Sequence, residues 1–229
     1  MRYSINDYSI SAKEKGWGNG WPHDRSADMR KVVAEKSNAR VNVHRKIARL
    51  VDILLEETER RGYTIHKEQT GGYSNRAIRK ANPKKPSNHS WGLAVDINSI
   101  INEFRTDGKL VTDVPVWMPK LWNKYGFAWG GAYKHNRKDP MHFEFMGSPA
   151  DADDKTQAAI KQLSPGGQVR TNIPPAAVHK YTVREGDTLS GIAARLHTRG
   201  GWPALYKLNR ATIGPNPGAI FPGQVLRLP

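Results

Sequence analysis

Two short segments of the 229-residue chain constrain its fold most, because each carries side chains that can act only if they meet in space. The first segment, SNHSWGLAVD, holds His89 and Asp96, and the second, DPMHFEF, holds Asp139 and His142. Two histidines and one aspartate are a suitable ligand set for a catalytic zinc ion, because these three donors leave the fourth tetrahedral position open. Asp139, three residues before His142, is placed to accept a proton from a water molecule in that position.

The residues around these side chains predict how the chain brings them together. Leu93–Ile97 favours a buried strand in which Asp96 is the one polar residue, and a buried carboxylate is costly unless it is paired or binds a metal. His142–Phe145 predicts a last strand of the same domain. If the two strands are neighbours, His142 comes alongside Asp96, while the proline after Asp139 keeps that carboxylate out of regular strand pairing.

Outside these segments, one long helix is the clearest element. Apolar residues recur every three or four positions over Val41–Arg61, and Gly62 follows as a natural helix end. Tyr63–Ile65 favours a short strand, and Thr70–Lys85, with its glycines and prolines, favours a loop. Met118–Tyr125 predicts a short helix. These elements indicate an α+β domain with a small antiparallel sheet and flanking helices.

Composition divides the chain into two domains joined by a linker. Residues 1–147 form the first domain, in which residues 1–30, rich in Gly, Trp, Asn and Ser, predict an irregular arm. Residues 148–179 carry the prolines and glycines typical of a semi-rigid linker, with a short helix over Lys155–Leu163. Residues 180–229 are patterned again, which predicts a second, small domain.

The overall composition limits which metal ligands and which classes of binding partner are possible. The chain contains no cysteine, so histidine and carboxylate side chains are its only strong metal ligands. Its net charge of +15, from 36 basic and 21 acidic residues, favours polyanionic partners. The basic residues are scattered and form no nucleic-acid-binding motif, so we expect no nucleic-acid partner. No stretch is apolar over the length of a membrane span, and the N-terminus lacks an apolar core of signal-peptide length.

The motifs SNHSWGLAVDIN and DPMHFEF resemble those of the zinc D-alanyl-D-alanine metallopeptidases, a family that includes the VanY-type carboxypeptidases and the L-alanyl-D-glutamate endopeptidases of phage endolysins. The family pattern is S-x-H-x-x-G-x-A-x-D, followed by a carboxylate three residues before a histidine. Every position is filled here: Ser87, His89, Gly92, Ala94, Asp96, Asp139 and His142. GGYSNRAI and GFAWGG-x-Y also resemble the family, so the similarity covers roughly residues 60–146.

This resemblance implies a role for each matching residue. It makes three residues the zinc ligands: His89, Asp96 and His142. It makes Asp139 the general base and Arg76 of GGYSNR the group that stabilises the oxyanion, with Arg79 as an alternative three residues away. Three further residues are candidates for lining the substrate cleft: Ser87, Trp129 and Tyr133. The two aromatic residues can equally belong to the core.

The second domain has the pattern of a β-α-α-β module. YTV and VLRL predict its first and last strands, a helix begins at Asp187 or Thr188, and Trp202–Leu208 predicts a second helix. Five apolar residues are expected to face its core: Ile192, Ala193, Leu196, Leu205 and Leu208.

The segments YTVREGDTLSGIA, WPALYKLNR and IFPGQVLRLP resemble LysM modules, which bind glycans that contain N-acetylglucosamine. The resemblance implies two binding loops, at 186–189 and about 213–220. Six residues in these loops are candidates for contacting the sugar: Gly186, Asp187, Thr188, Leu189, Ile213 and Pro217. Asp187 and Thr188 can alternatively serve only to cap the helix, and both roles can coexist.

A zinc peptidase joined to a glycan-binding module implies a peptidoglycan peptide hydrolase. Without a signal peptide, we expect a phage endolysin that is made in the host cytoplasm and acts on the cell wall after release. Its expected partners are the stem peptide and glycan of peptidoglycan, and anionic wall polymers that match the positive charge. A monomer is expected. A D-Ala-D-Ala carboxypeptidase and a non-catalytic wall-binding protein remain the alternatives, because the sequence does not decide which peptide bond is cut.

Overall fold

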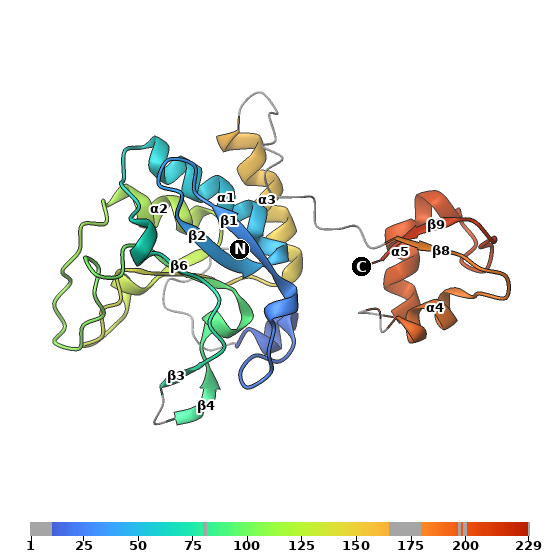
Figure 1. Ribbon diagram of the computed structural model, residues 1–229, viewed down its shortest axis with the longest axis horizontal. Helices are drawn as coiled ribbons and strands as arrows, with labels where there is room; N and C mark the ends of the chain where they lie inside the picture. The colour runs from blue at the N-terminus through green and yellow to red at the C-terminus, as the bar shows by residue number, and fades with distance from the viewer. Residues whose placement is uncertain (1–10, 80–81, 165–179, 197, 199–200, 229) are drawn as a thin grey trace. The chain divides into compact units, whose positions relative to one another are not determined.

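The chain divides into two compact units, Met1–Ile173 and Pro174–Pro229 (Figure 1). The computed structural model describes residues 11–79, 82–164, 180–196, 198 and 201–228. Each unit has its own apolar core. The architecture mixes helices with small antiparallel sheets, so the predicted α+β class is confirmed.

The first unit holds most of the regular structure. Its helices and strands are, in chain order, β1 (Met29–Val33), β2 (Arg40–His44), α1 (Arg45–Arg60), β3 (Ala77–Arg79), β4 (Asn82–Pro86), β5 (Ala94–Asp96), α2 (Trp117–Lys124), β6 (Phe127–Trp129), β7 (His142–Phe145) and α3 (Pro149–Leu163). Its short helical turns are η1 (Lys13–Trp17), η2 (Ser26–Asp28), η3 (Lys67–Gln69), η4 (Asn88–Trp91) and η5 (Gly130–Ala132). Across the described part of both units, every helix is too short or too polar to cross a lipid bilayer.

Helix α1 is the predicted long helix, but it begins four residues later than the periodicity indicated. Residues 40–44 instead form β2, which pairs antiparallel with β1. Val41 and Val43 are buried on one face of this strand, as the two-residue period requires, and Val43 also lies four residues before Ile47, which is why the helical pattern included it. The His44 ring then accepts a hydrogen bond from the Lys46 backbone N–H at 3.2 Å and caps the helix.

A three-stranded antiparallel sheet with the order β5-β7-β6 lies at the centre of the first unit. Its pairing places Asp96 at the end of β5 directly opposite His142 at the start of β7. Phe143 and Phe145 of β7 pack with Trp122 and Phe127 at ring-centroid distances of 4.9–5.4 Å, which fixes the strand against the core. The middle strand is therefore the most constrained part of the sheet.

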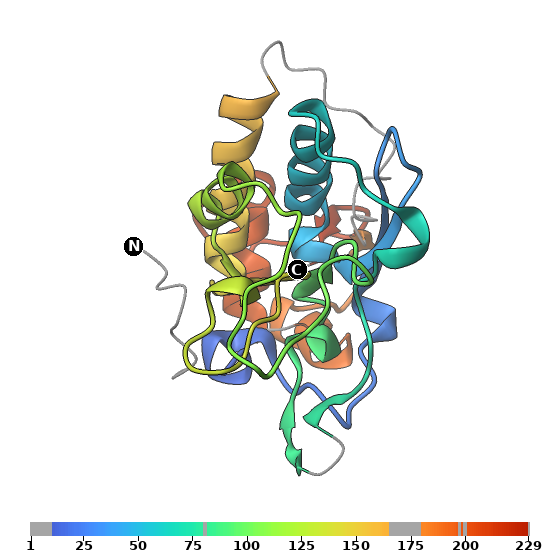
Figure 2. The same cartoon turned by 90° about the vertical axis from the view of Figure 1, so that its left-hand side faces the viewer.

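Two local predictions differ from the structure. Tyr63–Ile65 is not a strand, although Tyr63 and Ile65 are buried in the core. The segment expected to be a loop over Thr70–Lys85 contains the antiparallel pair β3–β4. Figures 1 and 2 both show this hairpin projecting from the rest of the first unit.

Helix α3 extends the first unit beyond the boundary expected from composition. Ser148 and Asp151 form a reciprocal capping box at its start, and Ala152 and Ala159 are fully buried. Figure 2 shows α3 running beside α1, with which it is in contact. Residues 148–163, expected as the first half of the linker, are thus a folded element, because small alanines allow close helix packing. Residues 165–179 lie outside the described residues.

The described part of the N-terminal arm, residues 11–28, lacks long regular elements but is firmly attached to the first unit. Trp17 is 1 % exposed, and its indole N–H donates to the Gly147 carbonyl oxygen at 2.8 Å. Its ring meets His44 and Phe145 edge-on. The arm is irregular, as predicted, yet it contributes a large aromatic residue to the core.

The second unit has the predicted β-α-α-β order. Its elements are β8 (Lys180–Thr182), α4 (Leu189–Arg195), α5 (Gly201–Ile213) and β9 (Val225–Arg227), with β8 and β9 paired antiparallel. Ile192, Ala193 and Leu205 are buried as expected. The predictions for Leu196 and Leu208 were wrong, since these side chains are 38 % and 44 % exposed on the outer faces of their helices.

Gly92, which lies between the first histidine and the aspartate, offers a test of how tightly this fold is packed. Its φ is +67°, and an added Cβ would lie 2.6 Å from the His44 backbone nitrogen, whereas Gly62 has a φ of +91° with open space around it. We expect Gly62→Ala to cost about 1 kcal/mol from backbone conformation alone. Gly92→Ala is expected to cost about 3 kcal/mol, because steric overlap adds to that strain.

The measurement is the free energy of unfolding of both variants by denaturant titration. Gly62→Ala serves as the matched control, because it isolates the conformational cost. Equal losses of stability in the two variants would show that the contact between Gly92 and β2 is not restrictive.

Candidate active site

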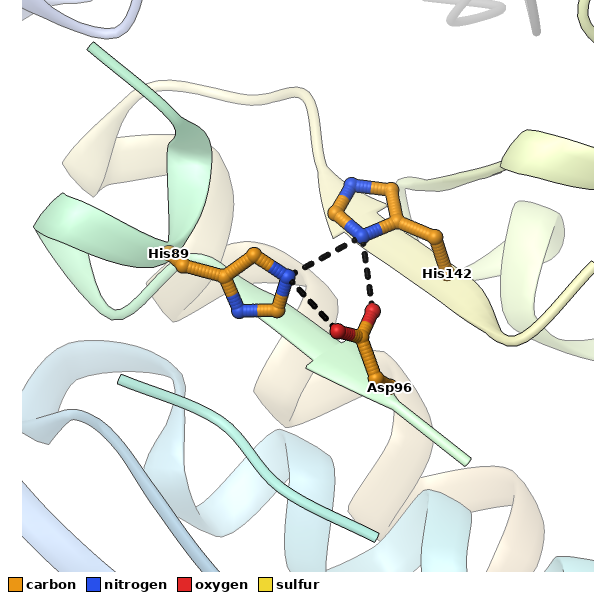
Figure 3. A group of neighbouring side chains, drawn as sticks. All are labelled: His89, Asp96 and His142. Atoms are coloured by element: carbon orange, nitrogen blue, oxygen red, sulfur yellow. Dashed lines mark hydrogen bonds and ion pairs between the residues drawn. The ribbon is translucent and has the colours of Figure 1, made fainter. Parts of the chain in front are cut away.

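Three ligand-type side chains meet at one edge of the β5-β7-β6 sheet (Figure 3). The His89 Nε2 atom lies 3.1 Å from Asp96 Oδ2, and His142 Nδ1 lies 2.9 Å from Asp96 Oδ1. The two imidazole nitrogens are 3.2 Å apart. All the ligand atoms lie within 4.8 Å of one another, so His89, Asp96 and His142 form a cluster that could hold a metal ion.

The local sequence explains how this cluster forms. Asp96 and His142 face each other because they are register partners in the β5–β7 pair. His89 comes from η4, which the Ser87 side chain caps and which Gly92 ends in a left-handed conformation. This tight reversal brings His89 back beside the strand that carries Asp96.

Hydrogen bonds on the outer side of each imidazole ring indicate which nitrogen is free for a metal. His89 Nδ1 lies 2.7 Å from the Gly72 carbonyl oxygen, and His142 Nε2 lies 3.3 Å from Glu144 Oε2. Both of these oxygens are acceptors, so each outer nitrogen can donate a proton to its neighbour, and each inner nitrogen can give its lone pair to a metal or carry a proton that it donates to Asp96. The two inner nitrogens lie 3.2 Å apart beside a carboxylate, an arrangement that a metal ion between them would satisfy. The donor set therefore fits a metal ion.

The electrostatics of the cluster also favour positive charge. Burial alone would raise the pKa of Asp96, but hydrogen bonds from His142 and His89 outweigh it and hold the pKa well below its usual range. Burial alone would lower the pKa of His142, but Asp96 and Glu144 raise it well above its usual value. The carboxylates thus stabilise a cationic occupant.

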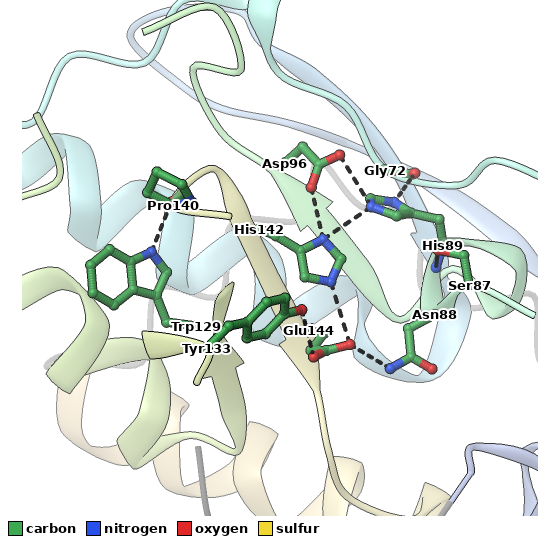
Figure 4. Close-up of polar contacts among 10 residues, drawn as sticks. All are labelled: Gly72, Ser87, Asn88, His89, Asp96, Trp129, Tyr133, Pro140, His142 and Glu144. Carbon is green, nitrogen blue, oxygen red and sulfur yellow. Dashed lines mark hydrogen bonds and ion pairs between the residues drawn. The ribbon is translucent and has the colours of Figure 1, made fainter. Parts of the chain in front are cut away.

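Glu144 is a functional residue that the sequence analysis did not identify. It is 4 % exposed, and it accepts hydrogen bonds from Asn88 Nδ2 at 2.6 Å and from the Tyr133 hydroxyl at 3.1 Å (Figure 4). Burial would raise its pKa, but His142, Asn88 and Tyr133 lower the pKa below its usual value. The signal was present in HFE, because residues two apart on a strand share a face, so Glu144 lies on the same face as His142.

Asp139 occupies a position suited to a general base. Its backbone N–H donates to the Gly130 carbonyl oxygen at 3.0 Å, and Gly130 has no room for a Cβ against Asp139. Its Oδ1 atom is buried without a hydrogen-bond partner among the described residues. Burial raises the pKa of Asp139, Asp96 and Glu144 add to the rise, and the nearby histidines oppose it. A buried carboxylate oxygen without a partner is costly, which indicates a functional role.

The cluster lies in a cleft of about 1530 Å³, which Asp96, Asp139 and His142 line together with other parts of the first unit. Of the residues expected in the substrate cleft, Ser87 and Tyr133 line it. Trp129 does not belong to this cleft. Its indole stacks on Phe143 and donates to the Pro140 carbonyl oxygen at 2.7 Å, as Figure 4 shows, so Trp129 is part of the core side of the sheet.

Arg76 also lines the cleft, at the residue before β3. Its carbonyl oxygen accepts a hydrogen bond from the Ser87 backbone N–H at 3.1 Å, which ties it to the segment that carries His89. Its side chain is exposed and has no hydrogen-bond partner among the described residues. The side chain of Arg79 lies outside the described residues, so its choice as an alternative stays a prediction.

The residues predicted to bind glycan have different environments in the second unit. Leu189 and Ile213 are 4 % and 8 % exposed and belong to the apolar core, so their side chains do not face a ligand. The Asp187 carboxylate is occupied by Tyr181, Arg184 and Arg195. The Thr188 hydroxyl caps α4 by accepting from the Gly191 N–H at 3.1 Å, which is the alternative capping role. Of the remaining candidates, Gly186 is exposed and Pro217 is half-buried.

A His–Asp–His cluster in a cleft, beside a buried carboxylate without a partner, is the arrangement of a metal-dependent hydrolase. Residues 81–145 match the family model described as D-alanyl-D-alanine carboxypeptidase, and this match contains His89, Asp96, Asp139 and His142. Residues 181–229 match the model of the LysM domain. Both predicted resemblances are therefore confirmed, and together they indicate a peptidase that acts on peptidoglycan.

Among curated proteins, the potassium binding protein Kbp of Escherichia coli O6:H1 is similar to part of the chain. The two are 33% identical over 88 residues, which cover 36% of this chain and 58% of that protein. The chain thus matches little more than half of the length of this relative. No solved structure matches the chain.

The position of Glu144 generates a prediction about metal affinity. We expect Glu144→Gln to weaken zinc binding roughly 10–100-fold, because the variant no longer holds the His142 tautomer with a charged acceptor. The measurement is competition for zinc with a chromophoric chelator. Glu68→Gln, at a side chain that is 83% exposed, is the control and should leave the affinity unchanged. An unaltered zinc affinity in Glu144→Gln would show that Glu144 does not support metal binding and is only a buried residue of the fold.

Proposed function

We propose that this chain is a zinc-dependent peptidoglycan peptide hydrolase of the phage-endolysin kind, which cuts the L-alanyl-D-glutamate bond of the stem peptide. The observation that supports it best is the joint placement of the His89–Asp96–His142 cluster and the buried Asp139 carboxylate in one cleft. The LysM match at residues 181–229 supports the wall substrate.

Zinc is the proposed metal, with His89 Nε2, His142 Nδ1 and an oxygen of Asp96 as its ligands. The donor set lacks thiolates and offers three ligands, so a tetrahedral zinc ion held by them would keep one position for water. When bound, zinc supplies Lewis acidity that lowers the pKa of water to about 7 and polarises a carbonyl group.

The chain's own residues supply the proton transfers and the charge stabilisation. Asp139 accepts a proton from the attacking water and delivers it to the leaving amine, and its raised pKa brings it closer to the pH at which such exchange is efficient. Arg76 stabilises the negative charge that develops on the carbonyl oxygen. Glu144 holds His142 in the tautomer that presents Nδ1 to the cluster.

The second unit and the net charge determine where the proposed enzyme is localised. A module that binds the glycan keeps the peptidase close to an insoluble substrate, which raises the effective concentration without new chemistry. The net charge of +15 favours adhesion to anionic wall polymers. The proposed site of action is therefore the cell wall, with the protein working as a monomer.

A D-Ala-D-Ala carboxypeptidase is the second candidate, because the family model that matches residues 81–145 carries that description. The two candidates share the ligands and the base and differ in the bond that is cut. The new ends produced from purified peptidoglycan separate them.

For the proposed endopeptidase, digestion of purified peptidoglycan is expected to create a free amino group on D-glutamate or D-isoglutamine. Labelling of new amino termini followed by mass spectrometry detects it. Release of free D-alanine without any new D-glutamate terminus would instead assign the carboxypeptidase activity.

The general-base role is tested by Asp139→Asn. We expect the rate of cell-wall lysis to fall roughly 10²–10⁴-fold while zinc content stays unchanged, because the amide cannot accept the proton. Removal of metal by a chelator should abolish lysis of the wild type, and added zinc should restore it. The measurement is the turbidity of a cell-wall suspension.

Asp154→Asn, at an exposed carboxylate of α3, is the matched control and should retain full activity. Lysis that survives both the chelator and Asp139→Asn would eliminate the zinc mechanism. The absence of lysis in the wild type as well would support a non-catalytic wall-binding protein.

A further inference from the structure

The N-terminal arm is bonded directly to the segment that carries the first histidine ligand. The Trp91 indole N–H donates to the Gly18 carbonyl oxygen at 2.9 Å, and the Trp21 backbone N–H donates to Ser90 Oγ at 3.1 Å. Ser90 is fully buried, and its hydroxyl in turn donates to the Ser87 carbonyl oxygen at 2.7 Å. Ser90 and Trp91 are the two residues that follow His89 in the chain. The arm and the metal cluster are thus parts of one rigid assembly.

Close packing fixes the position of Trp21 further. At Gly20, the residue before it, an added Cβ would lie 2.6 Å from the Trp91 ring. On its other side, the Pro22 carbonyl oxygen accepts a hydrogen bond from Asn75 Nδ2 at 3.4 Å. Asn75 precedes Arg76, so the backbone around Trp21 is held between the segment that carries His89 and the segment that carries Arg76.

The Trp21 ring, in contrast, differs from three other tryptophan rings of the first unit in its hydrogen bonding. The indole N–H groups of Trp17, Trp91 and Trp129 all donate to backbone carbonyl oxygens. The Trp21 ring is half-buried and has no hydrogen-bond partner in the described part of the chain. It lines the same cleft as Asp96 and His142. A ring whose backbone is fixed and whose polar edge is unpaired is suited to bind a ligand.

The charges around the cleft indicate the chemistry of that ligand. Arg76 and Lys85 line the cleft from the β3–β4 hairpin, and Arg137 lines it from the segment before β7. The Arg137 guanidinium lies over the Phe104 ring at 5.5 Å, and Phe104 also lines the cleft. Cationic groups interleaved with aromatic rings favour an acidic peptide, with backbone and carboxylate groups for both kinds of contact.

We propose that Trp21 of the N-terminal arm is a substrate-binding residue, whose ring contacts an acidic peptide in the cleft beside the metal cluster. The proposal rests on the proposed function, because the stem peptide with its D-glutamate carboxylate is the acidic peptide concerned. The arm is therefore a wall of the cleft rather than a passive extension, and Trp21 determines how tightly the peptide binds before the bond is cut.

The test measures kcat and KM of the full chain on the sugar-free peptide L-Ala-γ-D-Glu-L-Lys-D-Ala. Trp21→Ala is expected to raise KM roughly tenfold with kcat changed less than about twofold, since one aromatic contact is lost from binding. Trp21→Phe should restore most of the affinity. Zinc content and the unfolding transition should equal those of the wild type. Trp202→Ala, at a 44 % exposed tryptophan of the second unit, is the matched control and should leave both constants unchanged.

Four results would overturn all or part of the proposal. An unchanged KM would show that the ring does not contact the peptide, and a joint loss of zinc and kcat would make Trp21 a structural residue. A defect confined to intact peptidoglycan, absent on the sugar-free peptide, would assign the contact to the glycan. Equal binding of the peptide and of its carboxamide analogue would refute the acidic part of the proposal.

Binding of the same peptide to the Asp139→Asn variant, with and without Trp21→Ala, separates this proposal from the proposed function. A wild type that binds but never cuts the peptide, together with weaker binding after Trp21→Ala, would refute the hydrolase and retain the binding residue. Unaltered binding after Trp21→Ala in an active hydrolase would retain the proposed hydrolase and refute Trp21 as a binding residue.

Discussion

The register of a single strand pair, β5 with β7, is the constraint on which the site depends. It sets Asp96 opposite His142, and the β5 residues before Asp96 connect back through Gly92 to His89. The aromatic packing of Phe143 and Phe145 holds the middle strand in place from the core side. The ligand cluster is therefore positioned by apolar burial, although none of its own side chains is apolar.

The groups around the cluster act jointly to orient its histidines and to set its charge. The Gly72 carbonyl oxygen and the Glu144 carboxylate turn the free nitrogens of both histidines inward, while Asp96 supplies negative charge between them. The carboxylates around the cluster favour positive charge at its centre, either a metal ion or the protons that the histidines donate to Asp96. Because the cluster is assembled by the fold, metal binding there would add to the stability of the whole unit.

The sequence predicted the parts of this protein whose signals are local. The face of α1, the strands that carry Asp96 and His142, and the β-α-α-β order of the second unit all follow from short periodic patterns. The start of α1 was misplaced because Val43 lies four residues before Ile47, as on a helical face, although it shares a buried strand face with Val41. The role of α3 was missed because alanines give a weak apolar signal, yet they are what lets two helices approach closely.

Functional details that depend on distant residues were harder to predict. Glu144, which contacts His142, is itself held by hydrogen bonds from Asn88 and Tyr133, which lie 56 and 11 residues away in the chain. Leu189 and Ile213 looked available for a ligand because the sequence does not show which apolar residues the two short helices enclose. Trp21 carries no distinguishing pattern among seven tryptophans, and only its neighbours in space separate it from the others.

The alternation along β7 ties the chemistry of the cleft to the integrity of the core. His142 and Glu144 face the cleft, and Phe143 and Phe145 face the core, because successive strand residues point to opposite sides. A shift of one residue in the register of this strand would exchange the two sets, turning a histidine and a carboxylate toward the apolar core and two phenylalanine rings toward the cleft. A change of one residue in the length of this strand would therefore disturb the ligand cluster and the apolar core in the same step.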